Sequence, residues 1–168
     1  MISLNSLVAS KCEISTLAEV ADPNPLIEAD SLQEAQLLDS RVSQLTSTAA
    51  LLFELRTSLQ FDVGNAALLV VRGLSLFGWK SSAVQVPLAA MTVVSNVPYR
   101  APGSFRAKFG FFPGAQLEVA GAQAEFYVLE VDGISDVPPD YSAMSQEHIA
   151  GELPAWSSMC HPLQASST

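Results

Sequence analysis

Two histidines and two cysteines are the residues of this chain best suited to metal binding or nucleophilic catalysis. His148 and His161 lie in the C-terminal part, Cys160 directly precedes His161, and Cys12 lies near the N-terminus. Zinc sites usually take paired ligands at short loop spacing, which these four residues do not offer. A catalytic cysteine needs a base within hydrogen-bond reach, and adjacent strand residues such as Cys160 and His161 point apart. We therefore expect no metal, no cofactor and no catalytic residue, with His148 and Cys160 as the one conceivable pair.

Carboxylates of the last third of the chain are the second candidate group: Glu118, Glu125, Glu130, Asp132, Asp136 and Asp140. Glu125 and Glu130 fall on opposite faces of a predicted strand, so they do not form an acid–base pair by themselves. Glu54 and Arg56 share one strand face, and we interpret them as a surface ion pair of little energetic weight. The sequence has neither a glycine-rich phosphate loop nor a nucleophile elbow. The six carboxylates are therefore either an acidic binding patch or solubilising charges.

Aromatic residues either fill the core or form a contact surface. Most of them recur at strand spacing, which favours the core. Phe111 and Phe112 are neighbours, so both face inward only if both faces of their strand are covered. One of them, with Tyr99 and Trp156, is the expected exposed contact patch. Together with the acidic residues, the predicted partner-binding residues are Tyr99, Glu118, Glu125, Asp132, Asp136, Asp140, Tyr141 and Trp156.

The composition is that of one globular domain over residues 1–168, with a core at 41–158 and peripheral ends at 1–25 and 160–168. Hydrophobic residues make up 49% of the chain and charged residues 15%. Eight basic and seventeen acidic residues give a net charge of −9, which disfavours nucleic acid and attracts a basic partner. No apolar stretch is long enough to span a membrane, and no secretory signal is visible, so we expect a cytoplasmic protein without membrane attachment.

Strand patterns dominate the elements that must position these residues. Strands are predicted at 41–45, 66–77, 105–112 and 123–131. Residues 49–55 are a nearly continuous apolar run, which fits a buried strand or a helical turn. In the third strand Phe105, Phe109 and Phe111 point one way, while Arg106 and Lys108 point the other. Both faces of the strand at 123–131 carry large apolar groups, so we expect cover on both.

Short helices are predicted near 31–38 and 145–153. Ser31 with Glu34 three residues later fits a capping box, and Ser142 or Ser145 could cap the second helix, which Pro154 ends. Residues 80–104 are expected to be irregular apart from a strand at 89–94, and the last residues to be a loose end. The fold class is mainly β, an antiparallel sandwich or strongly bent sheet with short flanking helices.

Two stretches of the chain form a recognisable combination: GNAALLVVRGLSLFGW, and GFFPGAQLEVAGAQAEFYVLEVDGISDVPPDY followed by LPAWSS. They resemble a family of small acidic bacterial proteins that has no assigned activity. The resemblance spans residues 41–158, and its distinguishing strings are EFY, PPDY and LPAW. It implies a bacterial origin, and because the family has no known mechanism it assigns no catalytic residue to this chain.

Three functions follow from these observations as hypotheses. The first is a non-enzymatic protein-binding domain, similar to toxin-neutralising immunity proteins, whose acidic patch meets a basic partner. The second is a small-ligand-binding protein or enzyme with an aromatic-lined pocket. The third is a structural subunit that pairs an exposed sheet edge with its own copy, giving a homodimer. Cys12 and Cys160 are either unpaired thiols or a disulfide between the chain ends.

Overall fold

The fold is mainly antiparallel β, as the sequence predicts. The computed structural model describes residues 1–10, 19–82 and 88–168. These ranges contain ten strands of one open sheet and two helices, α1 (Leu4–Ala9) and α2 (Gln146–Gly151). The strands are β1 (Ile2–Ser3), β2 (Gln36–Ser43), β3 (Thr48–Glu54), β4 (Ala66–Arg72), β5 (Leu76–Ser81), β6 (Met91–Ala101), β7 (Ser104–Phe112), β8 (Ala115–Gly121), β9 (Gln123–Val131) and β10 (Met159–Ser167).

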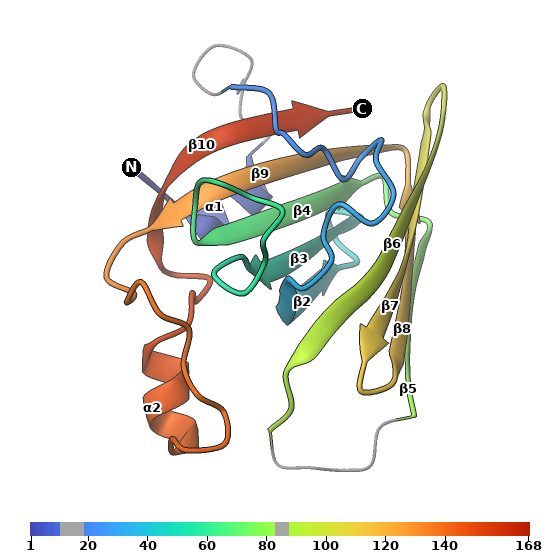
Figure 1. The fold of residues 1–168 in the computed structure, drawn as a ribbon. Coiled ribbons are helices and arrows are strands. Elements are labelled where there is room, and N and C mark those ends of the chain that lie inside the picture. The colour runs from blue at the N-terminus through green and yellow to red at the C-terminus, as the bar shows by residue number, and fades with distance from the viewer. Residues whose placement is uncertain (11–18, 83–87) are drawn as a thin grey trace.

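The sheet is strongly bent into two parts. Strands β1, β10, β9, β4, β3 and β2 form a six-stranded half, and β6, β7, β8 and β5 form a four-stranded half. Among the described residues, strand pairing joins the two halves where Gln36 pairs with Thr92 and Leu37 with Met91. Figure 1 shows the four-stranded half running across the direction of the other strands. The prediction of a sandwich or strongly bent sheet is therefore confirmed.

Two hydrophobic clusters lie on opposite faces of the six-stranded half. One fills the space between the halves, where Phe53 of β3 and Phe126 of β9 meet the inward side chains of β7. The other lies beneath α1, with Leu4 and Leu7 fully buried, and includes Trp156. Because β3 and β4 are covered on both faces, their sequences are continuous apolar runs rather than alternating ones. The expected cover on both faces of β9 is also confirmed.

The chain crosses between the halves at two neighbouring corners. Gly73 separates β4 from β5 and has a left-handed φ of 62°, which glycine adopts without strain. Gly121 ends β8, and a Cβ there would lie 2.6 Å from Val71 Cγ1 and 2.8 Å from the Arg72 carbonyl oxygen. The Ala122 N–H donates to the Arg72 carbonyl at 2.9 Å. Close backbone approach at this point therefore fixes the two halves against each other.

The predicted helix at 31–38 is wrong. Asp30 and Glu34 adopt left-handed φ values of 59° and 69°, and β2 begins already at Gln36. The Leu32 N–H donates to Asn96 Oδ1 at 2.8 Å, and the Glu34 N–H donates to the Val93 carbonyl at 3.0 Å. These long-range bonds to β6 hold the segment in turns instead of a helix. The second helix is confirmed as α2, with Ser145 as its cap: the Ser145 hydroxyl accepts from the His148 N–H.

Two other segments are more regular than predicted. Most of the stretch expected to be irregular is strand: β5 ends at Ser81, and β6 runs for eleven residues from Met91. Residues 83–87 lie outside the described residues. Pro98 fits within β6 because β2 pairs only with the first residues of that strand, so no neighbour there needs its missing N–H. The C-terminal residues, expected to be a loose end, form β10 and pair with β9.

Candidate functional site

The four-stranded half is covered on one face only. Its inward side chains belong to the core: Phe105, Phe109 and Phe111 of β7 are almost fully buried, as is Leu117 of β8. The alternation of strand side chains sends their neighbours to the opposite face. No segment of the described chain packs over that opposite face as α1 packs over the six-stranded half. The structure thus leaves one side of a four-stranded sheet open.

Strand register places the outward residues in cross-strand rows. The rows, in the strand order β6, β7, β8, β5, are Tyr99, Arg106, Ala120, Leu76; then Val97, Lys108, Glu118, Gly78; then Ser95, Gly110, Gln116, Lys80. We call these twelve residues, with Val94 and Phe112 at one end, the outer face.

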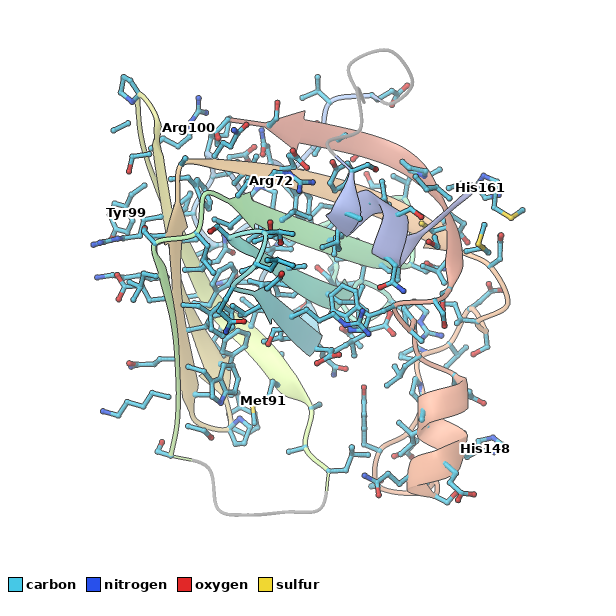
Figure 2. All side chains as sticks on the ribbon, turned by 180° about the vertical axis from the view of Figure 1, so that it is seen from behind. Arg72, Met91, Tyr99, Arg100, His148 and His161 are labelled. Atoms are coloured by element: carbon cyan, nitrogen blue, oxygen red, sulfur yellow. The ribbon has the colours of Figure 1, made fainter. Side chains whose placement is uncertain are left out.

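Exposed apolar side chains distinguish the outer face from an ordinary solvated sheet face. Phe112 is 66% exposed, Val94 51%, Tyr99 50% and Leu76 38%. The solvated face of an antiparallel sheet normally carries polar residues, so four large exposed apolar side chains on one such face make it a candidate contact site. Figure 2 shows Tyr99 on the side of the molecule away from α2. The interpretation that one of Phe111 and Phe112 is exposed is confirmed: Phe111 faces the core.

Charge is segregated between the two halves. The four-stranded half has four cations, Lys80, Arg100, Arg106 and Lys108, against the single carboxylate of Glu118. The rest of the described chain has three arginines and fifteen carboxylates. Three of the four cations, Lys80, Arg106 and Lys108, share the outer face with Glu118, so a protein of net charge −9 presents a locally positive face there. Such a face attracts acidic groups although the molecule as a whole repels them.

Two lysines of the outer face are not neutralised within the described chain. Arg106 is 3.4 Å from Glu118, so this pair satisfies itself. Lys108 Nζ lies 6.0 Å from the centre of the Tyr99 ring, a weak cation–π contact. Neither Lys80 nor Lys108 has a carboxylate within 4.0 Å among the residues that the structure describes.

A shallow hollow of about 500 Å³ lies in the middle of the outer face. Gly78 of β5 leaves the sheet backbone open there, whereas the side chain of Ser95 lies against Gly110 of β7. Leu76, Lys80, Val97 and Lys108 are among the residues around it. The hollow therefore combines an apolar border with two ammonium groups.

The structure does not bring the eight predicted partner-binding residues together. Tyr99 and Glu118 lie on the outer face. Asp132, Asp136, Asp140 and Tyr141 lie in the segment between β9 and α2, which contributes nothing to that face. Asp140 accepts two hydrogen bonds from Ser142, which lower the pKa of its carboxyl group.

Glu125 and Trp156 are buried, each 6% exposed, so neither is available to a partner on the surface. The Arg72 guanidinium pairs with the Glu125 carboxylate at 2.9 Å, and the Tyr127 hydroxyl donates to the same carboxylate at 2.8 Å. Trp156 Nε1 donates to Asp39 at 2.6 Å. Glu125 and Trp156 were predicted to bind a partner because the sequence does not show which strand faces and which C-terminal residues the fold covers.

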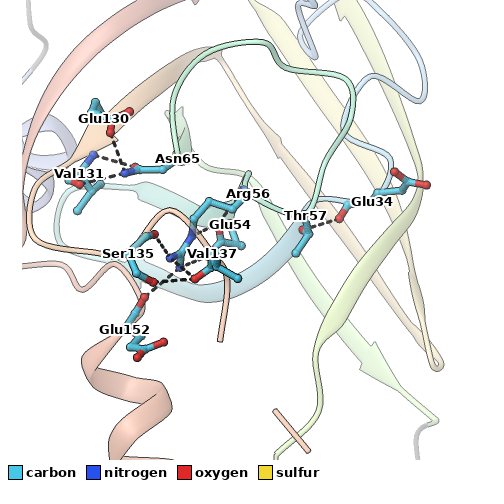
Figure 3. A network of polar contacts seen from close by, with 10 residues as sticks. All are labelled: Glu34, Glu54, Arg56, Thr57, Asn65, Glu130, Val131, Ser135, Val137 and Glu152. Carbon is cyan, nitrogen blue, oxygen red and sulfur yellow. Dashed lines mark hydrogen bonds and ion pairs between the residues drawn. The ribbon is translucent and has the colours of Figure 1, made fainter. Parts of the chain in front are cut away.

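Arg56 holds the acidic segment against the six-stranded half (Figure 3). Its guanidinium pairs with Glu54 at 2.6 Å and donates to the carbonyl oxygens of Ser135, Val137 and Glu152. The side chains of Glu54 and Arg56 are 0% and 4% exposed, so the interpretation as a surface ion pair is wrong. Burial and the charge of Glu54 raise the pKa of the neighbouring Tyr141. The Arg56 donors of this network all bind Glu54 or backbone carbonyl oxygens, so the network has a structural role.

The histidines and Cys160 do not form a reactive centre among the described residues. His148 lies 3.3 Å from Glu152 and His161 lies 3.8 Å from Asp132, and Figure 2 shows the two histidines well apart. Cys160 is buried, and burial raises the pKa of its thiol to about 11. Within the described ranges no three His, Cys, Asp or Glu residues are grouped as a metal site. Cys12 lies outside those ranges.

Sequence reasoning missed Lys80, Lys108 and the glycines of the outer face as site residues. The alternation at 105–112 already placed Arg106, Lys108 and Gly110 on one face. Lys80 joins them only through the pairing of β5 with β8.

Comparison of the chain with protein-family models, curated proteins and solved structures finds no match. The described residues include no helix that is long and apolar enough to cross a membrane. The resemblance to a family of acidic bacterial proteins stays a prediction.

Proposed function

We propose that this chain is a protein-binding domain without catalytic activity, and that the outer face is its contact surface. One observation supports the proposal above all: an uncovered four-stranded sheet face combines exposed aromatic and aliphatic side chains with locally positive charge. Aromatic residues and arginine are enriched at protein interfaces, where they bury much area at low entropic cost. Rows of β-strand side chains also form a rigid surface that needs little ordering on binding.

The charge of this surface changes the partner that we expect. Net charge alone predicts a basic partner, because acidic residues outnumber basic ones by nine. The exposed apolar residues of the outer face lie among cations, however, and a contact surface matches the charge of its partner locally. We therefore propose an acidic partner for the outer face. One hypothesis for the purpose of this binding is that the chain neutralises another protein, as immunity proteins do.

The proposal is tested with a displayed library of random twelve-residue peptides panned against the purified protein. Recovered peptides are then measured against the variant Tyr99→Ser/Phe112→Ser, which removes two exposed aromatic residues of the outer face. The matched control is Leu45→Ser/Leu59→Ser, because Leu45 and Leu59 are 97% and 87% exposed but lie outside that face. We expect at least a ten-fold weaker dissociation constant for the first variant and less than a two-fold change for the control.

Two results would contradict the proposal. Peptides that bind both double variants as tightly as the original chain would move the contact surface elsewhere. Failure to recover any binding peptide or protein segment would remove the support for a protein-binding function.

Self-association is a second candidate, favoured by the position of β5. This strand is an outermost strand of the sheet, and five of its six residues are exposed. An exposed edge strand is a template for pairing with another chain. Light scattering over a hundred-fold concentration range tests it: a mass of two chains supports pairing, and a constant mass of one chain excludes it.

A further inference from the structure

Gly78 is a glycine that the fold itself does not require. Its backbone is not left-handed, and a Cβ built there would meet only the Glu118 carbonyl oxygen, at 4.0 Å. Glycine inside a strand costs roughly 0.5–1 kcal/mol relative to alanine, because it loses more conformational freedom on folding. Gly110 differs, since a Cβ there would lie 2.9 Å from Ser95 Oγ. The open space above Gly78 is thus maintained at a cost in stability with no packing reason within the described chain.

Glycine in a strand often marks the place where a ligand or another chain approaches the backbone closely. The space above Gly78 opens into the hollow of the outer face, which Lys80 and Lys108 border. Glu118 also lines the hollow, but its carboxylate pairs with Arg106 at 3.4 Å, so the two ammonium groups give the hollow its net positive charge. Leu76 and Val97 complete the border with apolar surface.

We propose that the hollow above Gly78 receives a carboxylate side chain from an extended acidic segment of the partner protein. Lys80 and Lys108 hold the carboxylate, and Tyr99 and Leu76 pack against apolar side chains of the same segment. This inference rests on the proposed function. It adds the chemical class of the group that binds and its position in the hollow. Ammonium–carboxylate hydrogen bonds are stronger than neutral ones, so they set specificity at the centre of an otherwise apolar contact.

The extent of the positive charge favours a short acidic segment over nucleic acid. A nine-residue strand such as β7 is roughly 30 Å long, so the cationic area is bounded by that length. A long polyanion would extend onto the rest of the molecule and be repelled there, because the described chain outside the four-stranded half has fifteen carboxylates and three arginines. A concave centre also suits an inserted side chain better than the plane of a bilayer. A single peptide segment satisfies both constraints.

The decisive variant is Gly78→Val, which fills the hollow with a residue that strands favour. We expect a midpoint of urea unfolding equal to or higher than that of the original chain, together with at least ten-fold weaker binding of the library peptides. A loss of binding without a loss of stability would show that the valine side chain blocks the hollow and does not misfold the protein. Lys80→Gln/Lys108→Gln is expected to weaken binding to a similar extent, and Leu45→Glu/Leu59→Glu, with the same change of net charge, less than two-fold.

The chemistry of the partner is tested with the peptides themselves. Synthetic peptides in which every Asp and Glu becomes Asn or Gln are expected to bind at least ten-fold more weakly, and raising salt from 0.05 to 0.5 M is expected to weaken the acidic forms. Neutral or basic peptides that bind the outer face and tolerate Gly78→Val overturn this inference but leave the protein-binding function standing. Binding of a twenty-nucleotide oligothymidine or of phosphatidylserine vesicles, with no peptide bound, overturns both.

Discussion

Cys160 lies against the N-terminal strand, where its Sγ donates a hydrogen bond to the Ile2 carbonyl oxygen at 3.2 Å. Burial raises the pKa of this thiol to about 11. At pH 8 an ordinary thiol is partly ionised, whereas a thiol of this kind is almost entirely protonated. In a Cys12→Ser background, where Cys160 is the only cysteine, we expect iodoacetamide to react on the order of 100-fold more slowly with the folded than with the urea-unfolded chain.

The sign of the pH effect on stability follows from the same shift. The unfolded thiol loses its proton from about pH 8.5 upward, while the folded one keeps it until the pH is much higher. The Cys160 contribution to the free energy of unfolding is therefore complete at neutral pH and falls as the pH rises toward 11. Equal alkylation rates in the folded and unfolded chains would contradict this account.

Glu125 depends on Arg72 to be stable inside the protein. The Arg72 guanidinium also donates to the carbonyl oxygens of Leu7, Val8 and Ser10 at the end of α1. Removing one member of a buried ion pair leaves an uncompensated charge and costs about 3–5 kcal/mol. We expect Arg72→Met to lower the free energy of urea unfolding by about 3 kcal/mol, and the double variant with Glu125→Gln to recover part of that loss. No recovery would show that the α1 contacts, and not the pairing of charges, dominate.

At the scale of elements, the segment between β9 and α2 depends on contacts of Arg56. Its guanidinium donates to the carbonyl oxygens of Ser135 and Val137 in this segment and of Glu152 at the C-terminal end of α2, while it pairs with Glu54. Lysine cannot reproduce these contacts, because its three N–H donors share one nitrogen, whereas the guanidinium donates from three nitrogens spread over a plane. In Arg56→Lys we expect amide hydrogen exchange over residues 134–153 to accelerate at least ten-fold, with β4 and β9 unchanged.

The matched control is Arg100→Lys, because Arg100 is exposed and belongs to the four-stranded half. Exchange over 134–153 should not differ between this control and the original chain. If Arg56→Lys accelerates exchange equally in β4 and β9, the network stabilises the whole domain and not this segment in particular.

At the scale of the whole molecule, the bend of the sheet depends on the corner at Gly121. A methyl group there would collide with Val71 and with backbone oxygens, which cannot move without separating the halves. Overpacking of a fixed core site typically costs 1–3 kcal/mol. We expect Gly121→Ala to lower the free energy of urea unfolding by about 2 kcal/mol or more. Gly78→Ala, in open space, should instead raise it, by up to about 1 kcal/mol.

Segregation of charge is the second property of the whole molecule. The strands that hold Lys80, Arg106 and Lys108 are β5 and β7, which both pair with β8, while the acidic residues gather on the six-stranded half and its connections. No single element contains this asymmetry. It arises because β5 leaves β4 at Gly73 and pairs with β8 on the other side of the bend.

Sequence periodicity alone identified the strand character of β4, β7 and β9 and the apolar side of β7, but it missed most of β6 and all of β10, and it joined β4 and β5 into one strand at 66–77. Alternation at Phe105–Phe111 and the continuous runs of β3 and β4 reflect local side-chain periodicity, which is readable without a fold. Ser145 and Pro154 likewise bound α2 through local backbone chemistry. Which strand faces are covered could not be read from the sequence, because the covering residues are distant in sequence. Bonds to β6 converted the expected helix at 31–38 into turns, burial removed Glu125 and Trp156 from the surface, and strand pairing assembled the outer face from four separate segments.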